Sequence, residues 1–329
     1  MDAWTVDRGS RTLVRRTVPQ PEPGPRQLLV RVRACGVCRT DLHVVDEDIP
    51  PHRDRVVPGH QVVGEVSATG DEATGFAVGD LVGIAWLAST CGQCRHCRSG
   101  RENLCERARF TGWDVDGGYA EHALVDAAYA YALPHDADPL SIAPLLCAGI
   151  IGYRALSRAN LPPGGTLGIY GFGSSAHIAA QLAMASGARV FAMTRGERNR
   201  QLARELGVAF AGGSDAVPPE PLDSAIVFAP VGGLMTTALA ATERGGTVVS
   251  AGIHMSAIPE FSYDDLLFGE RDLRSVTANT RADGDEFLRL AHRLRLRPSV
   301  TTYGFEDVAL ALDDLRADRS RGSLVIAME

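Results

Sequence analysis

The 329-residue sequence predicts an α/β protein in which a β-rich, barrel-like domain is followed by a doubly wound parallel sheet. Between about residues 26 and 130, short runs of β-branched residues are broken by Gly and Asp, as in 27–36, 62–70 and 79–87. Such runs are typical of mostly antiparallel strands. From about residue 149, apolar strands alternate with helices, which predicts parallel strands joined by crossover helices.

The elements of the second region follow in a regular order. Continuous apolar or β-branched runs predict strands, and longer Ala- and Leu-rich runs between them predict helices. The strands are expected at 165–171, 189–193, 223–229 and 247–252, and the helices at 176–188, 198–207 and 234–246. After about residue 280, two amphipathic helices at 285–296 and 306–318 precede a closing strand at 323–328.

Composition limits the protein's class. Hydrophobic residues make up 45% and charged residues 22%, as in ordinary globular proteins. We find no run of about 18 apolar residues that would span a membrane and no secretory signal at the N-terminus. A cytoplasmic protein with reduced cysteines is therefore expected.

Charge excludes several activities. The net charge of −7, without a basic block, argues against nucleic-acid binding. All 33 basic residues are arginine, so chemistry that needs a lysine is excluded. Schiff-base catalysis and the phosphate-binding P-loop both belong to that group.

One loop holds four of the seven cysteines: Cys91, Cys94, Cys97 and Cys105. An odd cysteine count in a cytosolic chain disfavours a disulfide framework. The short spacings favour four thiolates around one structural zinc ion, with an iron–sulfur cluster or unmetallated thiols as alternatives. Because four thiolates fill a tetrahedral site, this zinc would stabilise structure and take no part in a reaction.

A glycine-rich turn joins the strand at 165–171 to the following helix. Gly171 permits a tight turn, Gly173 lets the backbone approach a pyrophosphate, and small Ala176 allows close helix packing. The helix N-terminus favours phosphate groups. The turn predicts a dinucleotide site, rather than a structural glycine turn, made by Gly171, Phe172, Gly173, Ser174 and Ser175.

The next strand ends in Thr194 and Arg195, where NAD-binding proteins usually carry an acidic residue. A guanidinium binds a 2′-phosphate in a charge-assisted contact, whereas a carboxylate would repel it. We therefore favour NADP(H) over NAD(H), with Arg198 or Arg200 assisting. The alternative is that the arginines are a solvated helix face, which suits Arg200 better than Arg195.

Cys38, His60 and Cys147 are candidate ligands of a second metal ion. Two cysteines and one histidine with an open fourth position form a known catalytic zinc arrangement. Taken singly, each of these residues is more often structural.

Together, these features resemble the zinc-dependent alcohol dehydrogenases of the medium-chain dehydrogenase/reductase superfamily. The resemblance covers essentially the whole chain, and its most specific motifs are GVCRTDLH, PGHQVVGEV, the cysteine loop, DGGYAEH and GFGSSAH. It implies a split, GroES-like catalytic domain around an inserted Rossmann coenzyme domain. The expected boundaries are 1–148, 149–278 and 279–329, with zinc at both metal sites.

The resemblance also assigns roles around the second metal site. Thr40 matches the first proton relay, and His43 would pass the proton through the coenzyme ribose to solvent. Asp41 would orient His60, and Arg39 matches a pyrophosphate contact. The alternative for Thr40 and His43 is a simple ST-turn and a surface histidine.

Several positions differ from the family pattern or match it weakly. Gln61 replaces the glutamate that usually follows the zinc histidine, so any exchange of that side chain onto zinc is in doubt. Arg321 is a further pyrophosphate candidate in uncertain register. Trp86 matches a substrate-pocket position but could be core, and Tyr119 and Cys35 are interpreted as structural.

The sequence thus predicts an oxidoreductase that transfers hydride between an alcohol, or the corresponding aldehyde or ketone, and NADP(H) or NAD(H). A polyol dehydrogenase on the same scaffold is one alternative. A non-catalytic redox sensor using Cys35 and Cys38 is another, although a sensor needs no proton relay. Family members are dimers or tetramers, commonly pairing near 247–261. The substrate and the physiological direction stay open.

Overall fold

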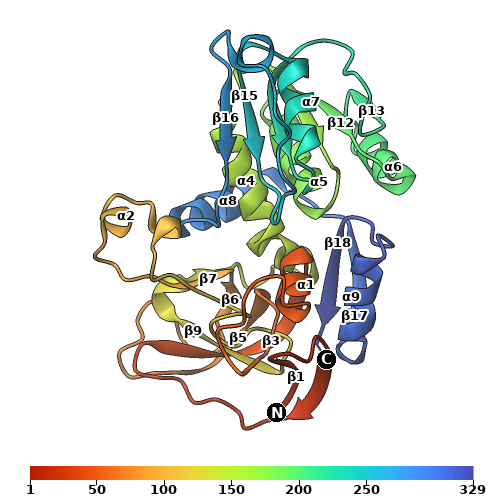
Figure 1. The fold of residues 1–329 in the computed structure, drawn as a ribbon. Helices are drawn as coiled ribbons and strands as arrows, with labels where there is room; N and C mark the ends of the chain where they lie inside the picture. Colours follow the sequence, from red (N-terminus) through yellow and green to blue (C-terminus); the bar gives the residue numbers. More distant parts are fainter. Residues whose placement is uncertain (329) are drawn as a thin grey trace. The chain divides into compact units, whose positions relative to one another are not determined.

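The computed structural model describes residues 1–328, which form two compact units (Figure 1). Unit 1 comprises residues 1–147, 278–285 and the C-terminal segment from residue 299. Unit 2 comprises residues 148–277 and 286–298. The predicted combination of a mostly antiparallel β-rich domain and a parallel doubly wound sheet is confirmed.

Unit 1 is built around a seven-stranded sheet with the order β10-β6-β5-β3-β18-β17, and β9 pairs with β3. Neighbouring strands are antiparallel except for β17 and β18. The strands of this sheet are β3 (Gln27–Val37), β5 (Gln61–Thr69), β6 (Leu81–Ile84), β9 (His122–Asp126), β10 (Ala130–Ala132), β17 (Val300–Gly304) and β18 (Ser323–Ala327). Because β18 pairs with β3, the C-terminal segment completes the sheet begun by the N-terminal one.

Shorter elements surround this sheet. The other strands of unit 1 are β1 (Asp2–Asp7), β2 (Leu13–Thr17), β4 (Arg55–Val56), β7 (Leu87–Ser89) and β8 (Arg109–Phe110). Its helices include α1 (Arg39–Val45), α2 (Arg95–Arg98), α3 (Pro139–Ile142) and α9 (Val308–Arg316). Apolar side chains such as Leu28, Val62, Ile84 and Ile326 fill the core and are almost completely buried. Their burial provides the main stabilisation of the unit.

Unit 2 contains a six-stranded parallel sheet with the order β13-β12-β11-β14-β15-β16. The strands are β11 (Thr166–Tyr170), β12 (Arg189–Met193), β13 (Phe210–Gly212), β14 (Leu222–Val227), β15 (Thr242–Ser250) and β16 (Asp272–Ser275). The helices are α4 (Ala148–Arg158), α5 (Ser174–Ala185), α6 (Glu197–Glu205), α7 (Gly233–Ala241) and α8 (Arg281–Leu294), of which α8 enters unit 2 at residue 286. Side chains of α5 and α6 pack in one apolar cluster and those of α7 in another, as expected for a sheet covered on both faces.

The strand order reverses between β11 and β14, and ligands of such sheets bind beyond the carboxyl ends of the strands at this point. Gly171 follows β11 directly and therefore lies at the switch point.

Residues 286–298, which the sequence boundaries place with the C-terminal catalytic part, lie in unit 2. Phe287 is fully buried there, with its ring centroid 5.9 Å from that of Tyr153. Nε2 of Gln181 donates a hydrogen bond of 3.1 Å to the carbonyl of Arg297. The contact of Phe287 in α8 with Tyr153 in α4, and that of Arg297 with Gln181, thus tie residues 286–298 to unit 2.

Among residues 1–328, no single helix is long and apolar enough to cross a membrane. The consecutive helical segments Pro139–Leu146 and Ala148–Arg158 are long and apolar enough only when taken together, and they are bent by 45° relative to each other. Their large apolar residues, such as Leu146 and Ile150, are fully buried in the protein.

Candidate functional site: a metal centre, a relay helix and a coenzyme turn

The second metal site begins at the start of helix α1. Cys38 is the N-cap residue, and its backbone N–H donates to Oδ2 of Asp41 at 2.8 Å. The Cys38 sulfur accepts a hydrogen bond from the backbone N–H of Thr40 at 3.4 Å. This reciprocal capping holds the thiol and the carboxylate in a defined relation.

Asp41 also orients His60. Its Oδ1 accepts hydrogen bonds from Nδ1 of His60 at 3.0 Å and from the backbone N–H of Gly59 at 3.3 Å. Asp41 and His60 are both 1% exposed. A carboxylate only accepts, so Nδ1 carries the proton and Nε2 has the lone pair for a metal ion. Nε2 lies 3.4 Å from the sulfur of Cys38.

Cys147 completes the group. The ligand atoms of Cys38, His60 and Cys147 all lie within 4.8 Å of one another. This spacing fits ligands of one zinc ion, which binds sulfur at about 2.3 Å and nitrogen at about 2.0 Å. The three predicted ligands, which are separated by up to 109 positions in the sequence, are therefore brought together.

Electrostatics in this group favour the metal-binding form of Cys38, the thiolate, but keep His60 and Cys147 protonated while no metal ion is bound. A hydrogen bond from the Cys147 thiol and the nearby His60 lower the pKa of Cys38 to about 5, although burial opposes this shift. Burial tends to lower the pKa of His60, but Asp41 and the Cys38 thiolate together raise it to about 10. The pKa of Cys147 is raised, first by its hydrogen bond to Cys38 and then by burial. A bound dication would displace the protons of His60 and Cys147.

Thr40 and His43 lie three residues apart on α1 and therefore share one helix face. Thr40 is 7% exposed and adjoins the metal ligands, whereas the side chain of His43 is 17% exposed. Nδ1 of His43 lies 2.8 Å from Oδ2 of Asp48, a residue that the sequence analysis did not single out. The guanidinium of Arg39, predicted to contact a pyrophosphate, lies 2.6 Å from the carboxylate of Asp318.

Aromatic side chains border the metal group. The ring of Trp86 meets the imidazole of His60 edge-on, with centroids 4.9 Å apart. Phe110 and Trp113 stack beyond it, with centroids 5.0 and 6.1 Å from that of Trp86. Trp86 thus lies beside a ligand and is only partly buried, as a pocket wall would be. The sequence analysis did not single out Phe110 and Trp113, because isolated aromatic residues carry no readable signal of a pocket.

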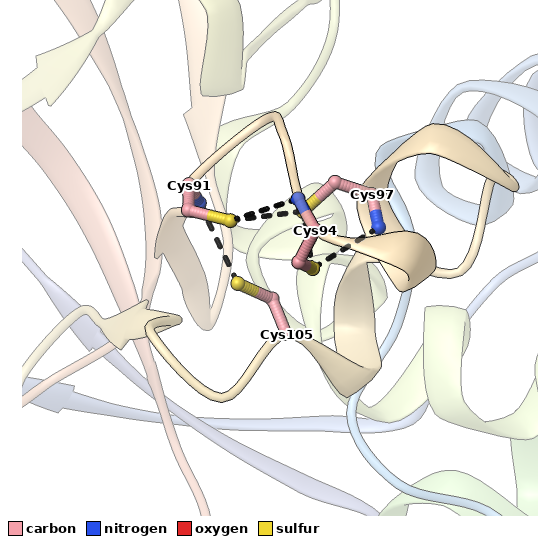
Figure 2. A group of neighbouring side chains, drawn as sticks. All are labelled: Cys91, Cys94, Cys97 and Cys105. Atoms are coloured by element: carbon pink, nitrogen blue, oxygen red, sulfur yellow. Dashed lines mark hydrogen bonds between the residues drawn. The ribbon is translucent and has the colours of Figure 1, made fainter.

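The four cysteines of the loop also converge (Figure 2). The sulfur of Cys97 lies 3.5 Å from that of Cys94 and 3.9 Å from that of Cys91. A tetrahedral zinc ion with four Zn–S bonds separates its sulfurs by about 3.8 Å. The observed distances match this value and are far longer than a disulfide bond. An iron–sulfur cluster spreads its thiolates over several iron atoms and needs wider spacing.

Backbone amides favour the thiolate form of Cys91, whereas burial raises the pKa of Cys105 to about 11. N–H groups of Gln93 and Cys94 lower the pKa of Cys91 to about 6. Arg107 hydrogen-bonds the Cys91 thiolate, which raises the pKa of the arginine. The fit supports the predicted ligand set, and Arg107 supplies positive charge beside the Cys91 thiolate.

The glycine turn has the backbone that a dinucleotide site requires. Gly171 has a φ of +86°, and a Cβ there would lie 2.9 Å from the Cβ of Ala229. At Gly173 a Cβ would meet nothing within 4 Å, so the backbone borders open space. Ser174 and Ser175 begin helix α5. Phe172 is 1% exposed, so only its backbone can contact a coenzyme.

The three arginines after β12 differ in their contacts: Arg200 binds the backbone of the turn, whereas Arg195 and Arg198 are exposed. Nη1 of Arg200 donates to the carbonyls of Thr194 and Arg195 at 3.0 and 2.8 Å, and its guanidinium pairs with Glu197. Arg200 therefore holds the turn. Arg195 and Arg198 are exposed, and Oγ1 of buried Thr194 accepts from the backbone N–H of Phe172. Arg195 remains the candidate for a 2′-phosphate.

Other positions of the sequence analysis lie away from this chemistry. Cys35 is completely buried, and burial raises the pKa of its thiol well above the ordinary value, which disfavours a redox role. Tyr119 is also completely buried. The side chain of Gln61 is buried against Gly36, and its Nε2 has no hydrogen-bond partner among the described residues. Arg321 is exposed.

Comparisons with known proteins agree with this geometry. Residues 24–135 match the alcohol dehydrogenase GroES-like domain, and residues 176–293 match the zinc-binding dehydrogenase family. A probable alcohol dehydrogenase of Mycobacterium tuberculosis is 53% identical, over 99% of this chain and 97% of its own.

Solved structures agree as well. Acetophenone reductase from Geotrichum candidum in complex with NAD has a TM-score of 0.89 and 28% identity, covering 99% of this chain and 96% of its own. A protein assigned as a zinc-binding dehydrogenase from Sinorhizobium meliloti 1021, bound to NADP, has a TM-score of 0.88 and 26% identity, covering 99% and 98%. With both domain types, the ligand geometry and a full-length relative in agreement, the chain belongs to the zinc-dependent alcohol dehydrogenases of the medium-chain dehydrogenase/reductase superfamily and is an oxidoreductase.

Proposed function

We propose that the protein interconverts primary or secondary alcohols and the corresponding aldehydes or ketones with NADP(H), using zinc held by Cys38, His60 and Cys147. The observation that carries the proposal is the Asp41–His60 hydrogen bond, which directs Nε2 toward Cys38 at the start of helix α1. Three protein ligands leave one coordination position for substrate.

When bound, zinc supplies a Lewis acid that polarises the substrate oxygen and favours alkoxide near neutral pH, while the nicotinamide exchanges the hydride. The protein supplies positioning and proton transfer. Trp86 limits the space beside His60 and thereby the size of the alcohol. The hydroxyl of Thr40 accepts the alcohol proton in oxidation, and His43 passes it on.

The coenzyme preference rests on Arg195, because the comparisons include structures with NAD and with NADP. Arg195 is exposed at the carboxyl end of β12, in the position where NAD-binding proteins usually carry an acidic side chain. We propose that Arg39 exchanges its exposed ion pair with Asp318 for a pyrophosphate, which costs little because exposed ion pairs are weak.

The first test is the rate of NADPH and, separately, NADH consumption with a panel of aliphatic and aromatic aldehydes. We expect turnover that favours NADPH, and Arg195→Gln should lower kcat/KM for NADPH about 10- to 100-fold. Arg204→Gln, which changes an exposed arginine farther along α6, is the matched control. Preference for NADH in the unchanged protein would refute the coenzyme assignment.

Metal analysis tests the centres themselves. Two zinc ions per chain are expected, and Cys38→Ser should lose one of them together with turnover. Cys35→Ala, which alters a buried thiol outside the ligand set, should retain both ions. A chain that holds one zinc or fewer would refute the two-site proposal.

We further propose a homodimer or homotetramer that pairs through the β16 edge of unit 2. Ile253, Ile258, Tyr263, Phe268 and Leu273 are 37–63% exposed around this edge, and such apolar exposure is typical of subunit contacts. Light scattering with Leu273→Glu would show a smaller species if the edge pairs. Unpaired thiols are compatible with the cytoplasm, which we propose as the location.

A further inference from the structure

Helix α1 ends in a turn that a non-glycine residue holds in the left-handed region. Glu47 has a φ of +58°. The backbone N–H of Asp48 donates to the carbonyl of His43 at 3.0 Å, and that of Glu47 donates to the carbonyl of Val44 at 3.4 Å. These two bonds define a Schellman motif, whose left-handed position is usually glycine. Unusual backbone conformations that persist in this way often serve a site.

The turn folds the chain back over the last residues of α1. As a result, Asp48 lies beside His43, with 2.8 Å between Oδ2 of the carboxylate and Nδ1 of the imidazole. The Asp48 side chain is 52% exposed, whereas that of His43 is 17% exposed. The contact therefore forms at the edge of the protein, with the histidine on the protected side.

Neighbouring acidic residues make other contacts. Asp46 and Asp313 pair with Arg316, and Asp318 pairs with Arg39. The carboxylate of Glu47 accepts a hydrogen bond from the backbone of Gly9. The carboxylate of Asp48, by contrast, contacts the imidazole of His43.

The contact selects one form of the ring. Because a carboxylate accepts and does not donate, Nδ1 of His43 is the protonated nitrogen. In the neutral imidazole, Nε2 is then the nitrogen that accepts a proton. Without an acceptor at Nδ1, both tautomers would be populated, and only one of them could take a proton at Nε2.

We propose that Asp48 is the positioning residue of the proton relay, and that the left-handed turn at Glu47 places it. It fixes the tautomer and orientation of His43, so that Nε2 is the acceptor in alcohol oxidation and the site of proton return in carbonyl reduction. This inference rests on the proposed relay through Thr40 and His43, and extends it by one residue.

The test uses the zinc-loaded protein with ¹⁵N-labelled histidine and four variants, of which His43→Gln serves for assignment and as a control of the relay. Asp48→Ala removes the acceptor, Asp48→Asn keeps an uncharged acceptor, and Asp54→Ala changes an exposed carboxylate of the same loop that pairs with Arg8. Long-range ¹H–¹⁵N spectra report the tautomer of His43, whose signals are assigned with His43→Gln. Thermal unfolding checks that each variant is folded.

The unchanged protein, Asp48→Asn and Asp54→Ala should show His43 protonated at Nδ1, whereas Asp48→Ala should show a mixture of tautomers. In alcohol oxidation, kcat of Asp48→Ala should fall about tenfold with KM nearly unchanged, and Asp48→Asn should retain most of it. An unaltered tautomer in Asp48→Ala would overturn the proposal, whatever its kcat. Full activity of His43→Gln would instead refute the relay of the proposed function, and the tautomer measurement would still decide the role of Asp48.

Discussion

Replacing Asp41 by Asn tests how strongly the protein prepares its metal centre. The carboxylate accepts three hydrogen bonds in a site that is 1% exposed: from Cys38 N, His60 Nδ1 and Gly59 N, at 2.8, 3.0 and 3.3 Å. An asparagine side chain has one oxygen and one NH₂ group. If its oxygen faces His60, its NH₂ group must face the backbone N–H of Cys38, and two donors then oppose each other.

The magnitude follows from this count. A buried donor left without a partner costs about 1–3 kcal/mol. Loss of a carboxylate behind a metal-ligating histidine typically weakens metal binding about 10- to 100-fold, or about 1.4–2.7 kcal/mol. The first cost lowers the free energy of unfolding, and the second weakens zinc binding at Cys38, His60 and Cys147. Zinc binding by the cysteine loop should be unaffected.

The assay measures zinc per chain after dialysis against chelators of increasing strength. We expect Asp41→Asn to lose one of two zinc ions at a chelator strength about 10- to 100-fold lower than the unchanged protein requires. Asp114→Asn is the matched control, because Asp114 contacts Nδ1 of His52 at 2.6 Å outside the ligand group.

Identical zinc release from Asp41→Asn and the unchanged protein would refute the argument that this hydrogen bond prepares the centre. Loss of both ions together would show that the variant unfolds, and would likewise contradict a local effect. Measuring the turnover of Asp41→Asn with added zinc separates two cases. Restored turnover indicates weaker zinc binding alone, whereas turnover that stays low indicates a defective site.

Three further predictions concern other parts of the chain. Burial lowers the pKa of His177 to about 4, so the unfolded chain binds more protons between about pH 6.5 and 4, and stability falls as the pH drops through that window. The loss in the free energy of unfolding is about 2 kcal/mol by pH 5. Melting temperatures at pH 7 and pH 5 should therefore differ less in His177→Gln than in the unchanged protein. An equal difference in both proteins would contradict the prediction. Cys97→Ser should lose the loop zinc and lower the melting temperature while the other zinc stays, which metal analysis checks; unchanged stability would show that the loop ion does not stabilise the fold. Gly171→Ala should weaken NADPH binding in fluorescence titrations, because the φ of Gly171 is +86° and the new Cβ would lie 2.9 Å from Ala229. Gly187→Ala controls for backbone strain alone, because Gly187 has a φ of +87° and its Cβ would meet no atom within 4 Å. Equal NADPH binding by both variants would contradict the steric argument.

Features that depend on nearby residues were readable in the sequence. Four cysteines within 15 positions converge because a short loop brings thiols together, whatever surrounds it. The alternation of apolar strands and helices predicted the parallel sheet, and the glycine turn predicted a dinucleotide site, since backbone freedom and phosphate approach need glycine locally. Cys38 and Thr40 likewise belong to one helix start, so their proximity follows from helix geometry.

Contacts across long stretches of chain needed the folded molecule. Strands β13 and β16 were not predicted, because they are short and pair through backbone groups that any side chain can carry. Residues 286–298 belong to unit 2 because Phe287 is buried there, a matter of packing that amphipathic periodicity does not specify. The contact of Asp48 with His43 depends on the backbone of Glu47, which a non-glycine residue does not reveal. Local patterns encode the elements and ligand types, whereas side-chain partners arise from tertiary packing, because burial and hydrogen bonding are satisfied only once distant segments meet.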